Sequence, residues 1–102
     1  PVYNSKVRMR RKKMENYQYP LDLNWSTEEM ILVVNFWADL EKVYEQGMDR
    51  QAFLDSYQSF KSVVKSIGEE RKLGREFEEL SGYSLYHAVK QAKASQNKRI
   101  KM

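Results

Sequence analysis

The chain has 102 residues, of which 41% are hydrophobic and 31% charged, with a formal net charge of +4 and one histidine. This length has room for a single domain, and the absence of cysteine excludes disulfides, thiol nucleophiles and cysteine-ligated zinc. The absence of cysteine fits a reducing compartment, so we expect a cytoplasmic protein. The longest apolar run, Met30–Val34, is far shorter than the roughly 20 residues that a membrane span requires.

The chain begins with a basic segment. Residues 1–13 hold six basic side chains and no acidic one, residues 90–102 hold five and none, and the stretch between them holds all 14 acidic side chains and seven basic ones. We expect residues 1–16 to form a disordered tail. The favoured interpretation of residues 1–13 is an extension before a natural start at Met14, and the alternative is a functional tail that binds polyanions weakly and without base selection. The candidate polyanion-binding side chains are Arg8, Arg10, Arg11, Lys12 and Lys13.

An apolar lead-in, residues 17–25, precedes the first predicted helix, which starts at Ser26. Ser26 and Glu29 have the spacing of a capping box, in which each side chain bonds the backbone N–H of the other residue. The helix should run to about Gln46 and end at Gly47, which adopts the left-handed conformation at little cost. Its apolar stripe covers roughly 200° of the helical wheel, more than one neighbouring helix buries.

Two further helices follow. Asp49 is placed to cap the second, whose apolar residues recur at helical spacing, and Ser66 is placed to cap the third, which should end at Ser81 and Gly82. Gly74 costs about 1 kcal/mol inside a helix relative to alanine, and we attribute it to a close helix crossing. The predicted buried stripes contain Phe53, Tyr57, Phe60, Val64 and Ile67 in the second helix and Leu73, Phe77 and Leu80 in the third.

Ser84 is placed to cap a fourth helix, in which Leu85, Ala88, Val89 and Ala92 share one face. The short turns predict an all-α fold, with about four helices in a compact array forming one domain over residues 17–95. Residues 96–102, which are basic and lack periodicity, are expected to fray.

No arrangement of side chains has the spacing of a metal, phosphate or nucleophile site. A single histidine cannot supply the two Glu-x-x-His repeats of a dimetal bundle, and the paired glutamates lie mostly in first helical turns, where they stabilise the helix dipole. We therefore expect a non-enzymatic protein without a cofactor. A small-molecule enzyme is the weakest alternative and would use a groove formed by Asp22, Trp25, Tyr83, Tyr86 and His87.

The surplus apolar surface of the first helix favours an interaction module that binds another protein or a second copy of itself. Nucleic-acid binding through the two basic ends is the alternative. The side chains assigned to the interaction surface are Ile31, Leu32, Phe36, Val43, Leu54 and Tyr86.

Four segments carry a family resemblance: Tyr17–Asp22, Trp25–Met30, Tyr57–Lys61 and Phe77–Tyr86. Together they resemble, in order and spacing across residues 14–94, the YktA-like family of small uncharacterised proteins from Bacillota. The resemblance implies a compact helical protein and supplies no activity, cofactor or site residue.

Overall fold

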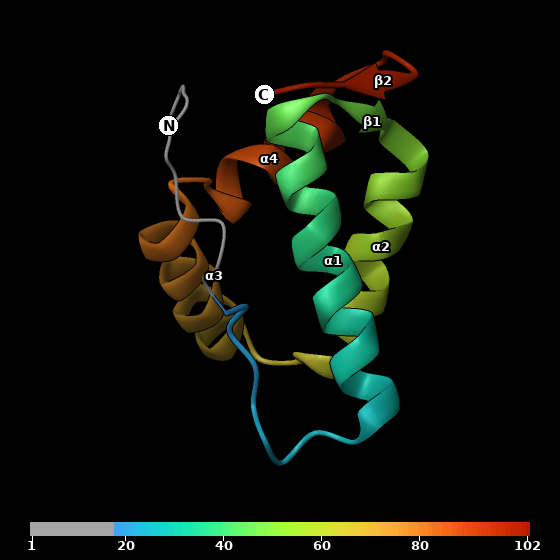
Figure 1. Cartoon of the computed structure of the whole chain (residues 1–102). Coiled ribbons are helices and arrows are strands. Elements are labelled where there is room, and N and C mark those ends of the chain that lie inside the picture. Colours follow the sequence, from blue (N-terminus) through green and yellow to red (C-terminus); the bar gives the residue numbers. More distant parts are fainter. Residues whose placement is uncertain (1–17) are drawn as a thin grey trace.

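Four helices make up most of residues 18–102, the part of the chain that the computed structural model describes (Figure 1). They are α1 (Thr27–Glu45), α2 (Arg50–Val63), α3 (Ile67–Ser81) and α4 (Leu85–Ala94), and the predicted all-α class is confirmed. The expected disordered tail, with Arg8, Arg10, Arg11, Lys12 and Lys13, lies outside the described residues.

The helices begin and end where the sequence places their caps. The Ser26 hydroxyl accepts a 3.1 Å hydrogen bond from the Glu29 N–H, and the Glu29 carboxylate accepts one of 2.8 Å from the Ser26 N–H, completing the predicted capping box. Gly47 and Gly82 end α1 and α3 with φ of +84° and +82°, a conformation that side chains with a Cβ rarely adopt. The other three helices are capped by the side chains of Asp49, Ser66 and Ser84.

Aromatic side chains of α1 organise the core. The fully buried Phe36 ring lies with its centroid 4.7 Å from that of Phe60 on α2, and the fully buried Trp37 ring stacks on Phe77 of α3 at 4.6 Å. The Trp37 indole N–H also donates a 3.0 Å hydrogen bond to the Pro20 carbonyl, which attaches the lead-in to the core. The wide apolar stripe of α1 is therefore buried mainly by neighbouring parts of its own chain.

The helices pack in different ways. In Figure 1, α1 and α2 run antiparallel side by side, and α4 crosses the upper end of the molecule. At the α3–α4 contact, a Cβ added to Gly74 would lie 3.0 Å from Cδ2 of Leu85, which confirms the predicted close helix crossing. Among residues 18–102, no helix is both long and apolar enough to cross a membrane.

The C-terminal segment corrects one expectation, because it is ordered and does not fray. Strand β2 (Arg99–Ile100) pairs antiparallel with β1 (Met48–Asp49), and the Ile100 side chain is only 4% exposed. Arg50 holds the segment by donating from its guanidinium to the carbonyls of Ala92 and Asn97 and from its backbone N–H to Lys98. Two-residue strands are too short to produce a detectable sequence period, so pattern analysis missed this contact.

Candidate functional site

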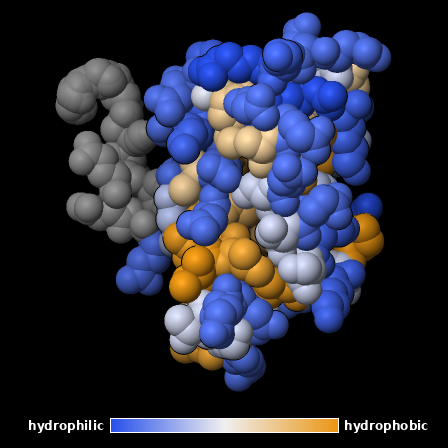
Figure 2. Space-filling view, turned by 90° about the vertical axis from the view of Figure 1, so that its right-hand side faces the viewer, coloured by the Kyte–Doolittle hydropathy of each residue, from blue (hydrophilic) through white to orange (hydrophobic). Residues whose placement is uncertain are grey.

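The residues assigned from the sequence to an interaction surface differ in how far they are exposed. Phe36 and Val43 are fully buried, so assigning them to a surface was wrong, while Leu32 and Leu54 are half-buried. Ile31 is 52% exposed. Figure 2 shows apolar side chains gathered in the lower half of one face, at the level where Figure 1 places the lead-in and the start of α1.

The five residues of the weak candidate groove have different surroundings. The Asp22 carboxylate accepts from the Asn24 N–H in a local turn, and Trp25 packs on the edge of the core. Tyr83 stacks on Tyr44, with ring centroids 4.6 Å apart. The exposed His87 places Nδ1 2.9 Å from the Ser84 hydroxyl at the start of α4.

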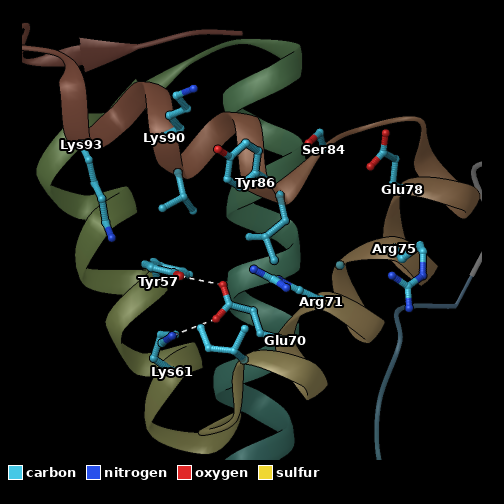
Figure 3. Close-up of a pocket in the computed structure, with 14 residues that line it drawn as sticks. Tyr57, Lys61, Glu70, Arg71, Arg75, Glu78, Ser84, Tyr86, Lys90 and Lys93 are labelled. Carbon is cyan, nitrogen blue, oxygen red and sulfur yellow. Dashed lines mark hydrogen bonds and ion pairs between the residues drawn. The ribbon is translucent and has the colours of Figure 1, made fainter.

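Tyr86 is the fifth of those residues, and it lines a groove between α2, α3 and α4 (Figure 3). The groove has a volume of about 640 Å³, within the range of ligand sites. Asp22, Trp25, Tyr83 and His87 do not line it, so the grouping expected for an enzyme is not formed there. The groove combines cationic side chains with an apolar floor.

A hydrogen-bonded anion lies at one end of the groove. The Glu70 carboxylate accepts a 2.6 Å hydrogen bond from the Tyr57 hydroxyl and one of 2.8 Å from the Lys61 ammonium, joining α3 to α2 (Figure 3). Burial raises the pKa of the Tyr57 phenol, and the bond to the negative Glu70 raises it further. Tyr57 therefore stays protonated at neutral pH and serves as a hydrogen-bond donor.

Four cationic side chains also line the groove, and two of them, Arg71 and Lys93, lie near its Glu70 end (Figure 3). Arg71 and Arg75 project from α3, and Lys90 and Lys93 project from α4, with Lys93 pointing toward Tyr57 (Figure 3). The Lys93 ammonium lies 5.6 Å from the centre of the Tyr57 ring, and that of Lys90 lies 5.7 Å from the centre of the Tyr86 ring. Within residues 18–102, none of the four cations forms an ion pair with an acidic side chain.

The floor between these cations is apolar. Leu85 and Val89 of α4 are almost fully buried beneath the groove, and Gly74 of α3 contributes no side chain. Ile67 and Tyr86, which are 57% and 66% exposed, extend the apolar surface at the ends of α3 and α4. Such a surface is able to bind a ligand that is both anionic and apolar, because it offers charge and buried area together.

Sequence reasoning missed this site, apart from Tyr86. Arg71 and Arg75 are four residues apart and Lys90 and Lys93 three apart, so each pair shares a helix face, and this spacing was the available signal. That the two pairs stand on opposite sides of one groove depends on the packing of α3 against α4, which the spacing does not specify.

A comparison with protein families matches residues 16–101 to the uncharacterised protein family UPF0223. The chain belongs to the UPF0223 family. A UPF0223 protein from Enterococcus faecalis strain V583 is 55% identical over 89 residues, which cover 87% of this chain and 97% of the relative. The UPF0223 protein YfdD of Lactococcus lactis strain IL1403 is 57% identical over 81 residues, which cover 79% and 87%.

Family membership confirms the broader part of the sequence resemblance, an uncharacterised bacterial family, while the YktA-like label stays a prediction. All the groove residues lie within the matched UPF0223 region. The candidate basic tail residues, Arg8 to Lys13, lie outside it.

Proposed function

We propose that this UPF0223 protein is a non-enzymatic, cytoplasmic interaction module that binds an acidic, partly apolar segment of a partner protein in the groove between α2, α3 and α4. The observation that carries the proposal is a set of four cations around an apolar floor, Arg71, Arg75, Lys90 and Lys93, which form no ion pair with an acidic side chain of the described part of the chain. The proposed surface for the partner therefore lies in the groove between α2, α3 and α4 and not on α1, and of the residues assigned to a surface from the sequence it keeps Tyr86.

Charge complementarity supports an acidic occupant. Cations that line one groove repel one another, and a ligand carboxylate placed among them relieves that repulsion. Burial of apolar ligand groups against Leu85 and Val89 would stabilise the complex by about 25 cal/mol for each Å² of apolar surface removed from water.

Nucleic acid fits the groove less well. Glu70 and Glu78 also line it, and the stretch from residue 14 to residue 89 has twice as many acidic as basic side chains. A phosphate backbone would meet these carboxylates, whereas a protein segment can place its own acidic groups selectively beside the cations.

The test is a binding titration with a synthetic probe. A fluorescein-labelled peptide of about 20 residues, built from Glu, Leu and Ala, is titrated with the full chain and followed by fluorescence anisotropy. The double variant Arg71→Glu/Lys93→Glu, which reverses one charge on each side of the groove, should weaken binding at least tenfold, or about 1.4 kcal/mol.

The matched control is Lys72→Glu/Lys98→Glu. It changes the net charge equally at exposed positions that do not line the groove, one of them next to Arg71. Equal loss in both double variants would indicate general attraction to a basic protein and would overturn the proposal, as would tighter binding of single-stranded RNA than of the peptide. Circular dichroism of all variants verifies that they are folded.

A further inference from the structure

We infer that the occupant of the groove is an amphipathic α-helix, with an apolar stripe facing Leu85 and Val89 and carboxylates along both flanks of that stripe. The inference rests on the proposed function and adds the conformation of the partner segment and the pattern of its residues. It follows from how the groove is lined and from the spacing of its charges.

The lining favours a helix because it is made of side chains on helices. Tyr57 and Lys61 come from α2, Arg71 and Arg75 from α3, and Lys90 and Lys93 from α4. No residue of β1 or β2 lines the groove, so the described lining offers no strand edge with which an extended segment could pair. An extended segment would lose water from its own backbone groups over the apolar floor without replacing those hydrogen bonds. A helical segment satisfies them internally.

The charges have helical spacing. Arg71 and Arg75 are four residues apart on α3, a rise of about 6 Å, and Lys90 and Lys93 are three apart on α4, a rise of about 4.5 Å. Acidic side chains at i and i+4, or i and i+3, of a docked helix recur at the same distances. One flank of that helix would face the α3 arginines and the other the α4 lysines, as their positions on opposite sides of Figure 3 suggest.

The floor fits the apolar stripe of such a helix. Gly74 lets Leu85 pack closely against α3, so the floor has no projecting side chain at that point, and the exposed Ile67 and Tyr86 add further apolar surface to the lining. Side chains at i, i+3, i+4 and i+7 of the partner would contact this floor, the usual pattern of a helix bound in a groove.

Three peptides of identical length separate the alternatives. The first places Leu at helical spacing with Glu on both flanks, the second has the same composition with Leu and Glu alternating, and the third is the first with a central proline, which costs about 3 kcal/mol in a helix. Each is titrated against the wild-type chain and against Arg71→Glu/Lys93→Glu by anisotropy, and circular dichroism measures the helicity that the peptide gains on binding.

We expect the first peptide to bind at least tenfold more tightly than the other two, to gain helicity, and to lose affinity in the double variant. If the alternating peptide binds equally well and is also weakened by the double variant, the helix inference is wrong and the proposed function stands. If none of the three binds the wild-type chain, the proposed function itself fails. Binding of the first peptide without any gain of helicity would also contradict the inference.

Discussion

The hydroxyl of Tyr57 on α2 donates a 2.6 Å hydrogen bond to the carboxylate of Glu70 on α3. Lys61 contacts the other oxygen of that carboxylate at 2.8 Å, so a single anion neutralises one cation of the groove and satisfies its buried phenol. In the proposed complex, Glu70 would compete with a ligand carboxylate for the Lys61 ammonium.

Replacement of Glu70 should therefore strengthen binding of an acidic peptide. Glu70→Gln removes the negative charge and frees the Lys61 ammonium, so we expect about fivefold higher affinity, close to 1 kcal/mol. Anisotropy titration with the helical Glu/Leu peptide measures the effect. Glu78→Gln makes the same change of charge on the same helix, where no ion pair is lost within the described residues, and should have at most a twofold effect. Weaker binding by Glu70→Gln would show that the pair supports the ligand site and does not compete with the ligand.

Stability should fall at alkaline pH. Burial raises the pKa of Tyr19, Tyr44 and Tyr57, so the folded state holds these phenol protons more tightly than the unfolded state, in which they dissociate near pH 10. This stabilisation is complete below about pH 10 and is lost as pH rises toward the folded-state pKa values. Urea unfolding between pH 8 and pH 11 tests the slope. Tyr57→Phe should make this slope shallower, because it removes the phenol whose pKa is raised by burial and by Glu70. An unchanged slope in this variant would contradict the prediction.

Two glycines of α3 should respond to alanine in opposite directions. Gly68 has no atom near its missing Cβ, so Gly68→Ala should raise the unfolding free energy by about 0.5–1 kcal/mol. At Gly74 the added Cβ would meet Leu85 at 3.0 Å, and overpacking of about 1–3 kcal/mol outweighs the gain in helix propensity. Denaturant titration of both variants measures the difference. If Gly74→Ala destabilises as much in a Leu85→Ala background as in the wild type, this contact is not the cause.

The C-terminal segment should depend on Arg50. Arg50→Ala removes hydrogen bonds of 3.0 Å and 3.1 Å to the Ala92 and Asn97 carbonyls, so we expect a loss of about 1.5–3 kcal/mol and faster hydrogen exchange at the Met102 amide, which donates to Val43. The control is Arg99→Ala, which removes one exposed bond to the Gln46 carbonyl and should cost less than about 0.5 kcal/mol. Equal effects of the two substitutions would contradict the role given to Arg50.

Local signals in the sequence predicted the helices well. Caps such as Ser26 and the left-handed Gly47 act within a few residues of themselves, and their geometry depends little on the rest of the fold. Signals that depend on packing were less informative. Ile67, predicted on the buried stripe of the second helix, is 57% exposed because α2 ends at Val63 and Ile67 begins α3.

The candidate site also combines features that local sequence patterns predict with features that depend on tertiary packing. Patterns along α3 and α4 identify which cations share a face, but the floor between them depends on tertiary packing such as the close approach of Leu85 to Gly74. The apolar stripe of α1 was assigned to a surface because the wheel counts apolar residues and does not identify what covers them. Phe36 is in fact surrounded by the rings of Trp37, Phe53, Tyr57 and Phe60.

Because the Trp37 indole donates a hydrogen bond to the Pro20 carbonyl, its fluorescence reports whether the lead-in is attached to the core. Trp37 is fully buried and Trp25 only partly so, so the two indoles should emit at different wavelengths, with the Trp37 contribution at shorter wavelength. Detachment of the lead-in would break the bond and admit water to the indole of Trp37, shifting its emission to the red. Tryptophan fluorescence can therefore follow release of the lead-in without an added label, even where the helical signal in circular dichroism does not change.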